Sequence, residues 1–296
     1  MTARAAARPD SRLNQAIALS LLAMLAFAVM DAISKVLAGA LSIPQILWVR
    51  YILFTALAVM VLRKQGLRRV WHTERPWLQA FRAALLVIEN GVFVLAFKYL
   101  PLADVHAIAA ASPLIVIALS SPILGEQVGP RRWLAVIVGF LGVLLIVRPG
   151  FQEFGPGIAI ALLGAVLWGL YQILMRLCAK TDASATTWLW SAVIGLLLTT
   201  VTGPSTWVWP DARGWLLLAV IAALGSVAHL ALIRAFSLAE AGALQPFGYT
   251  MLLWAAVIGY LAFGDVPDRW TLTGAAIIMA SGLYAWNRER VRARAA

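Results

Sequence analysis

The sequence has a single cysteine and few charged residues for its length. Cys178 stands alone, which excludes an intrachain disulfide and a metal site built from cysteines. Charged residues make up 12% of the 296 residues, against about 25% in ordinary soluble domains, whereas hydrophobic residues reach 62%. A water-soluble fold of this size cannot hide so much apolar surface. Long apolar runs recur along the whole chain, so we expect lipid to surround most of it.

Several catalytic motifs are also absent. The chain has no G-x-x-x-x-G-K-[ST], which excludes a P-loop ATPase, and no H-E-x-x-H. The segment AFGD at 262–265 lacks the GxGD form of intramembrane aspartyl proteases. Hydrolysis therefore has no visible apparatus, and we predict no enzyme activity, no cofactor and no metal. An intramembrane enzyme and a membrane scaffold protein stay open as alternatives outside transport.

Apolar windows of about 20 residues, long enough to cross a hydrocarbon core of about 30 Å, occur ten times. The connections between them are short and rich in proline and glycine. The sequence therefore predicts an all-α integral membrane protein with ten transmembrane helices. The expected spans are 15–37, 45–63, 77–97, 103–123, 132–148, 157–177, 186–203, 214–234, 240–262 and 270–287.

Basic residues are distributed unevenly between the connections. Lys and Arg number 24 against 13 Asp and Glu, and they gather in alternate connections and at both ends of the chain. Assigning the connections to alternate sides places 17 basic residues on one side and four on the other. This pattern marks the cytoplasmic face of a membrane protein and argues against a nucleic-acid partner. We therefore expect the tails 1–14 and 288–296 to be cytoplasmic, and the first span to be retained rather than cleaved.

The second half of the chain repeats the first. Residues 96–127, AFKYLPLADVHAIAAASPLIVIALSSPILGEQ, align without a gap to residues 235–266, an offset of 139. Upstream, Phe27 and Lys35 are eight residues apart, as are Trp168 and Arg176 in the second half. We therefore predict two repeats of five spans each.

An odd number of spans inverts the second repeat, at 157–287, relative to the first, at 15–148. Inverted halves are typical of transporters, because two similar halves can exchange roles and open a central cavity to either face. The related motifs LGEQVGPRRW at 124–133 and FGDVPDRW at 263–270 then lie on opposite faces. A duplication without transport, with acids that only cap helix ends, is the alternative.

Polar residues in the middle of spans are candidates for a substrate site, because burying ionisable groups in a bilayer costs a few kcal/mol or more. Glu89 and Asn90 lie in the middle of the third span. Asn90 aligns with His229 in the repeat, so we expect these two side chains to meet near the central axis. The alternative is an interhelical hydrogen bond that only holds helices together.

Two further aligned pairs are candidates. Asp31 aligns with Gln172, and it lies four residues before Lys35, within reach of an i,i+4 ion pair. An acid at this depth could instead bind a substrate ammonium or a coupling proton. His106 aligns with Gln245, and a histidine titrates near neutral pH, which suits proton handling. A helix-end ion pair with Lys35 is the alternative for Asp31, and capping of a helix end is the alternative for His106.

Aromatic residues and prolines complete the candidate site. Trp168, Tyr171 and Tyr249 offer aromatic faces suited to apolar or aromatic amino acids, although Trp and Tyr also mark bilayer interfaces. Pro113 and Pro246 interrupt the fourth and ninth spans and could supply the bending that gating needs.

The chain resembles the drug/metabolite transporter superfamily, specifically its ten-span EamA-type members. The segments that carry the resemblance are PLADVHAIAAASPLIVIALSSPILGEQ and RRWLAVIVGFLGVLLIVRPG in the first half, and LLGAVLWGLYQILMR and AFGDVPDRWTLTGAAIIMASG in the second. Phe27 and Phe97 stand where the family often has Trp and Leu. The resemblance covers residues 18 to 287.

The resemblance implies a secondary carrier of small metabolites in a bacterial inner membrane. The branch it looks most like exports amino acids, including aromatic ones, and we expect such a substrate, a monomer or weak homodimer, and alternating access. A drug, nucleotide-sugar or other metabolite carrier on the same scaffold is the alternative.

Overall fold

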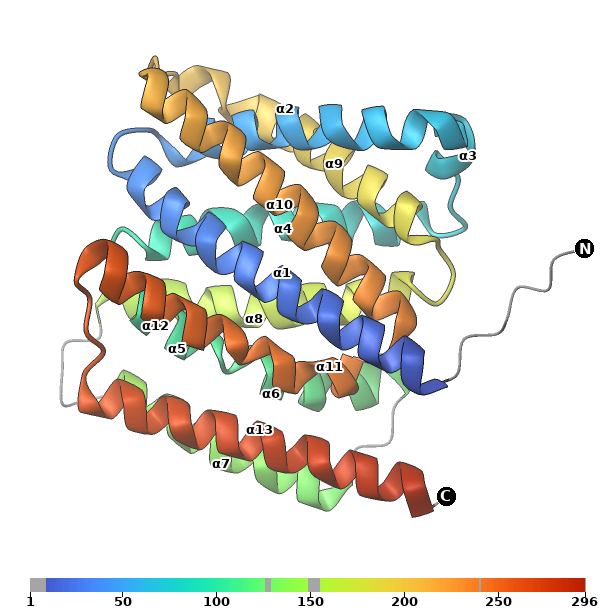
Figure 1. Ribbon diagram of the computed structural model, residues 1–296, viewed down its shortest axis with the longest axis vertical. Coiled ribbons are helices and arrows are strands. Elements are labelled where there is room, and N and C mark those ends of the chain that lie inside the picture. The colour runs from blue at the N-terminus through green and yellow to red at the C-terminus, as the bar shows by residue number, and fades with distance from the viewer. Residues whose placement is uncertain (1–8, 126–128, 149–154, 240, 296) are drawn as a thin grey trace, which may run out of the picture.

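The protein folds into a bundle of helices, seen in a computed structural model that describes residues 9–125, 129–148, 155–239 and 241–295 (Figure 1). No strand occurs within these ranges. Glu126, the acid of the first repeated motif, lies outside the described residues, as do Arg4 and Arg8 of the N-terminal tail.

Thirteen α-helices are present among the described residues. In chain order they are α1 Pro9–Ala38, α2 Ile43–Leu62, α3 Leu67–Trp71, α4 Pro76–Ala96, α5 Leu102–Ala109, α6 Ser112–Leu119, α7 Pro130–Val147, α8 Pro156–Cys178, α9 Ser184–Thr202, α10 Ala212–Leu238, α11 Ala241–Gly248, α12 Thr250–Phe263 and α13 Arg269–Ala295. Single turns η1 Arg63–Gln65, η2 Ser120–Leu124 and η3 Pro204–Thr206 follow α2, α6 and α9.

These helices make ten crossings. Eight stretches among the described residues are long and apolar enough to span a membrane, and α7 contributes the shorter apolar stretch Trp133–Val147. α13 supplies the tenth, and α5–α6 and α11–α12 are each one crossing broken in the middle. The predicted all-α membrane fold is confirmed. α1 begins and α13 ends on the same side of the bundle, hereafter the terminus side, as an even number of crossings requires (Figure 1).

The packing of the helices shows the two-fold relation between the halves. α2 and α9 lie at one edge of the bundle, and α7 and α13 lie at the opposite edge (Figure 1). Between them, α1 packs against α10, α11 and α12 of the second half, while its counterpart α8 packs against α4, α5 and α6 of the first. The first helix of each half therefore packs against helices of the other half, and the surfaces between the halves lie at the centre of the molecule.

Two glycines confirm the register of the repeat. Gly125 and Gly264 are 139 residues apart, and they adopt left-handed backbone conformations with φ of 74° and 70°. Their backbone N–H groups point to equivalent carbonyls, those of Ser120 and Ser121 for Gly125 and those of Gly259 and Tyr260 for Gly264. A side chain would strain this conformation, so glycine ends the fourth and ninth crossings in the same way.

Both broken crossings carry a proline near the break. The fourth is interrupted at Ala110 and Ala111, and Pro113 occupies the first turn of α6 that follows. The ninth is interrupted at Tyr249, and Pro246 lies within α11, three residues earlier. Since proline removes a backbone donor, it favours such interruptions.

α7 and α13 approach closely at two glycines. A Cβ on Gly142 would lie 2.8 Å from the carbonyl oxygen of Gly274, and a Cβ on Gly274 would lie 2.6 Å from that of Gly142. Any larger side chain would push the helices apart, so these glycines set their spacing.

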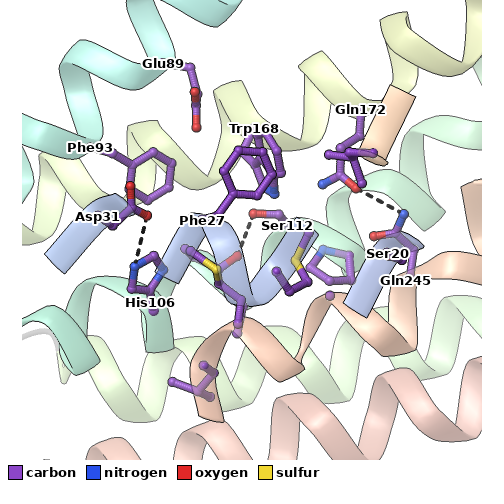
Figure 2. A pocket seen from close by; sticks show the side chains of 18 of the residues that line it. Ser20, Phe27, Asp31, Glu89, Phe93, His106, Ser112, Trp168, Gln172 and Gln245 are labelled. Carbon is purple, nitrogen blue, oxygen red and sulfur yellow. Dashed lines mark hydrogen bonds and ion pairs between the residues drawn. The ribbon is translucent and has the colours of Figure 1, made fainter. Parts of the chain in front are cut away.

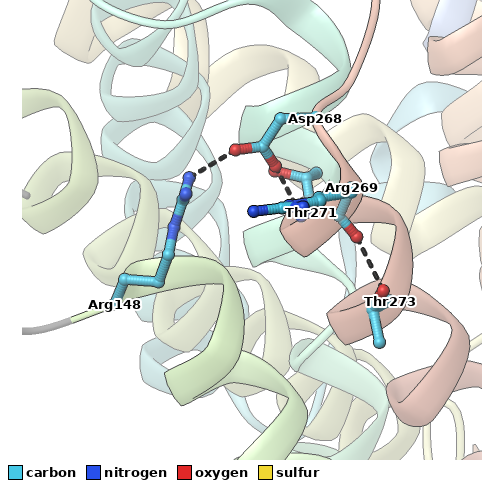
Figure 3. A network of polar contacts seen from close by, with 5 residues as sticks. All are labelled: Arg148, Asp268, Arg269, Thr271 and Thr273. Atoms are coloured by element: carbon cyan, nitrogen blue, oxygen red, sulfur yellow. Dashed lines mark hydrogen bonds and ion pairs between the residues drawn. The ribbon is translucent and has the colours of Figure 1, made fainter. Parts of the chain in front are cut away.

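Two ion pairs join the halves on the far side, opposite the terminus side. Lys35 Nζ at the end of α1 lies 3.0 Å from Asp265 Oδ2, just after α12. Arg148 Nη2, after α7, lies 2.6 Å from Asp268 Oδ2 (Figure 3). Asp268 Oδ1 also accepts the Thr271 N–H at 2.7 Å and so caps α13. Burial raises the pKa of the Asp268 carboxyl, but the hydrogen bonds from Thr271 and Arg148 and the charge of Arg148 together outweigh burial and lower this pKa below its usual range.

Candidate functional site

A cavity lies between the two halves, lined by residues of α1, α4, α5, α6, α8, α10, α11 and α12. The space that the centre of a water molecule can reach inside it is about 80 Å³. Ser20, Met24, Phe27 and Asp31 line it from α1 because positions spaced by three or four residues share one face of a helix. The cavity therefore runs along α1 from near the terminus side toward the far side.

The lining is acidic. Asp31 and Glu89 contribute carboxylates, and His106 and His229 contribute imidazoles. No Lys or Arg is found among the described residues that line the cavity. The arrangement therefore favours a group with positive charge over a phosphate or another anion.

Glu89 is held on the cavity face of α4, with only 6% of its surface exposed. Its carboxylate points toward the space between Phe93 and Trp168 (Figure 2). Within the described part of the chain no hydrogen bond or ion pair to this carboxylate is formed. A buried carboxylate without a partner is costly in a membrane, which makes Glu89 the group most in need of a ligand.

Asp31 and His106 form a pair at the far-side end of the cavity, the Asp31 end. Asp31 Oδ2 lies 3.4 Å from His106 Nε2 (Figure 2). The imidazole lies parallel to the ring of Phe93, with centroids 6.2 Å apart. The alternative for Asp31, an ion pair with Lys35, is wrong, because Lys35 reaches past the end of α12 to Asp265 while Asp31 faces α5.

Gln172 and Gln245 form a pair at the terminus-side end, the Gln172 end. Gln245 Nε2 donates a hydrogen bond to Gln172 Oε1 at 3.4 Å (Figure 2). Gln172 aligns with Asp31 in the repeat, and Gln245 aligns with His106. The structure therefore places both aligned pairs in contact, one at each end of the cavity.

The rings of Phe27 and Trp168 meet edge to face between the two ends, with centroids 5.7 Å apart. These residues are equivalent in the repeat. Equivalent residues touch only where they lie beside the two-fold axis, so the axis passes through the cavity. Carriers with inverted repeats bind their substrates at this interface.

Asn90 and His229 both line the cavity, but they do not bond each other in the described structure. Asn90 Nδ2 donates to the Leu86 carbonyl one turn back at 2.6 Å. His229 is enclosed by aromatic rings, with the Phe27 centroid 4.8 Å away. The expectation that the two side chains meet is therefore correct for the shared cavity and wrong for direct contact.

Three predicted site residues do not line the cavity. Tyr171 is fully buried, and its hydroxyl accepts a hydrogen bond from Arg82 Nη1 at 3.4 Å. Tyr171 faces Arg82 on α4, whereas its neighbour Gln172 faces the cavity. The Tyr249 hydroxyl contacts Gly282 on α13, outside the cavity lining, and Pro246 also lies outside it, whereas Pro113 lines it.

The structure adds Arg50, which the sequence places in the second span but does not single out. Only 5% of its surface is exposed, its Nη1 lies 3.7 Å from the sulfur of Met30, and its guanidinium lies over the ring of Tyr51. Met30 separates it from the cavity. A basic residue in the middle of a span was the available signal, by the same reasoning that selects Glu89.

Ten helical crossings in two inverted halves, with an acidic and aromatic cavity on their axis, define a multi-pass membrane transporter. The chain belongs to the EamA-like transporter family, which matches residues 14–148 and 155–285.

Named relatives carry several different substrates in their names. The chain is 25% identical over 270 residues to an S-adenosylmethionine uptake transporter of Rickettsia prowazekii, with 91% of this chain and 92% of the relative covered. It is 27% identical over 280 residues to a riboflavin transporter of Rhizobium johnstonii, covering 92% and 91%. It is 28% identical over 273 residues to a pseudopaline exporter of Pseudomonas aeruginosa, covering 91% and 95%.

A crystal structure of a protein 19% identical in sequence matches the fold with a TM-score of 0.68, covering 94% of this chain and 98% of the other. This likeness shows the fold alone.

Proposed function

We propose that the protein is a secondary carrier that moves amino acids, including aromatic and large neutral ones, and related amine-bearing metabolites by alternating access. The observation that carries the proposal is the unpartnered Glu89 carboxylate in a cavity whose described lining has no basic residue. A substrate ammonium would supply the missing partner through charge-assisted hydrogen bonds.

Aromatic faces support the second part of the substrate class. Phe27, Phe93 and Trp168 surround the space toward which Glu89 points (Figure 2). An aromatic or large apolar side chain gains contact area and favourable ring geometry there. Trp168 also offers a face to a cation, which suits an ammonium group bound at Glu89.

The size of the cavity favours a small substrate. About 10–15 Å³ of such space holds one water molecule, so the cavity has room for roughly five to eight waters. A single amino acid suits this space, whereas a flavin with its side chain would need the halves to separate.

A carrier of larger heteroaromatic metabolites is the second candidate. The names of the relatives favour it, since S-adenosylmethionine and riboflavin both contain fused heteroaromatic rings. S-Adenosylmethionine also carries an amino group and a positive charge, which an acidic aromatic cavity suits. A drug or nucleotide-sugar carrier is a weaker alternative, because a nucleotide sugar brings phosphates to a cavity without basic lining.

We further propose a bacterial inner-membrane location with the terminus side in the cytoplasm. The uneven distribution of Lys and Arg between the connections supports this orientation. Export or bidirectional movement and coupling to protons belong to the same proposal. Loss of transport in Glu89→Gln would separate a carrier from a scaffold protein, and a requirement for sealed vesicles would separate it from an intramembrane enzyme.

The test is counterflow of radiolabelled substrates in proteoliposomes, where unlabelled substrate inside drives the entry of label. The panel holds tryptophan, phenylalanine, leucine, S-adenosylmethionine and riboflavin. We compare wild type, Glu89→Gln and the control Glu74→Gln, which removes an exposed acid outside the cavity. Amino-acid counterflow lost only in Glu89→Gln supports the proposal. Movement of riboflavin or S-adenosylmethionine alone favours the second candidate.

A further inference from the structure

The two ends of the cavity carry pairs that occupy equivalent positions but differ in their ability to bind a proton. Asp31 and His106 approach to 3.4 Å at one end, and Gln172 and Gln245 approach to the same distance at the other. An imidazole and a carboxylate both titrate, whereas a pair of amides does not. The two halves thus share a side-chain contact at equivalent positions, but only the contact in the first half can bind a proton.

We propose that the Asp31–His106 pair is the proton-binding site that couples transport to a pH gradient, and that Glu89 is left to the substrate. This inference rests on the proposed carrier function. One proton binds at His106 Nε2 in the protonated form of the carrier and leaves from the same atom after the cavity has opened to the opposite side. No bond other than this N–H forms or breaks.

The geometry of His106 supports this role. Its Nε2 has no hydrogen-bond partner within the described structure, although Asp31 Oδ2 faces it at 3.4 Å. Protonation would turn this loose approach into a charge-assisted hydrogen bond. Only 4% of the His106 surface is exposed, and the rings of Phe93 and Phe97 cover it on one side. The imidazole is therefore largely shielded from water while it lines the cavity.

Charged groups on the neighbouring helices allow the pair to respond to a substrate. Glu89 on α4 interacts electrostatically with Asp31 and with Arg50 on α2, and Lys35 lies one turn further along α1, held by Asp265. When Glu89 is ionised, its negative charge favours the proton on His106. A substrate ammonium bound at Glu89 would cancel that charge and favour release of the proton. Binding of the substrate and binding of the proton in this cavity therefore disfavour each other.

The test uses the second half of the protein as the template for a variant. Asp31→Gln with His106→Gln gives the first pair the chemistry of the second. In proteoliposomes, we expect this variant to retain counterflow of the labelled amino acid within about threefold of wild type. Accumulation driven by an imposed pH gradient should fall to the level seen without a gradient. Glu74→Gln, which removes an exposed acid outside the cavity, is the control that should keep both activities.

A measurement on the wild type keeps the proposal testable should the variant fail to fold. A pH-sensitive dye inside the vesicles reports protons that move when a substrate gradient alone is imposed, and we expect a signal in wild type and none in His106→Gln. Wild-type counterflow without any proton movement would overturn the proton site and leave the carrier intact. Accumulation of substrate by the double variant at the wild-type level would likewise overturn the proton site and leave the carrier intact. Absence of counterflow in wild type would instead refute the proposed function.

Discussion

The Asp31 end and the Gln172 end of the cavity are built from equivalent residues, yet only the Asp31 end can ionise. The same contrast runs through the repeat. Gly125 and Gly264, which end equivalent crossings, are identical in residue and conformation. The equivalent cavity residues differ, as Phe27 does from Trp168 and Asn90 from His229. The halves have thus kept what shapes the backbone and diverged where a substrate would be held.

Removing charge from the cavity should have the largest effect. We expect Glu89→Gln to weaken the apparent affinity for amine-bearing substrates by at least about tenfold, since a charge-assisted hydrogen bond contributes about 1.5–3 kcal/mol. Gln172→Ala, which removes a neutral amide at the other end, should change it by only a few-fold. Concentration dependence of counterflow measures both. Equal losses in the two variants would show that charge does not distinguish the ends.

Substitution of the two glycines tests the feature that the halves share. Gly125→Ala and Gly264→Ala should each destabilise the protein by about 1–2 kcal/mol, because a Cβ is unfavourable at positive φ and nothing else lies within 4 Å of either position. Thermal unfolding in detergent should show similar decreases in Tm for the two variants. Gly155→Ala is the control, since that position is equally open and has no positive φ. A loss at only one of the two sites would argue against equivalent caps.

The far-side ion pair between Lys35 and Asp265 should have a moderate effect on the balance between conformations. Lys35→Met or Asp265→Asn removes a partly exposed pair that joins the halves, and such pairs contribute about 0.2–1 kcal/mol. We expect up to about fivefold more opening on the far side. In a Cys178→Ser background, labelling of a cysteine at Met30 by a membrane-impermeant reagent measures this opening.

The charge-reversed double variant, Lys35→Asp with Asp265→Lys, should restore the wild-type labelling rate because it remakes the pair. Labelling that stays high in the double variant would show that the single substitutions act through something other than the lost attraction.

The second far-side pair should give the smallest effect, which is present near neutral pH and disappears at low pH. The folded-state pKa of Asp268 is lowered, so its contribution to stability is present above its unfolded value of about 3.9 and is lost as the pH falls through the lower folded value. Asp268→Asn should therefore have a lower Tm than wild type at pH 6 and nearly the same Tm near pH 3. A difference in Tm that persists at pH 3 would assign the effect to the cap on Thr271 rather than to charge.

The sequence predicts most of the fold, because the length of each apolar run, the prolines and glycines between runs and the internal repeat are local properties of the chain. It also places eight of the ten predicted substrate-binding residues on the cavity, since ionisable and amide groups in mid-span must face protein rather than lipid. The ion-pair partners of these residues were harder to predict than their positions. The i,i+4 rule gives Lys35 to Asp31, whereas the crossing of α1 into the second half brings Asp265 closer to Lys35.

Helix phase explains the remaining differences. Tyr171 and Gln172 are adjacent in sequence, and only the packing of α8 against α4 decides that Tyr171 faces Arg82 while Gln172 faces the cavity. Arg50 likewise comes close to the cavity through the packing of α2 against α10, which composition does not reveal.

The glycine contact between α7 and α13 has a consequence for how such a molecule moves. The two-fold relation maps α7 onto α13, and it maps α2 onto α9, so each edge pair is its own counterpart. When the halves exchange conformations, most other neighbouring pairs of helices are exchanged for different pairs, but each of these two edge pairs maps onto itself. We therefore expect the backbone contact at Gly142 and Gly274 to stay closed throughout the cycle, as one of two fixed pivots about which the central helices rock.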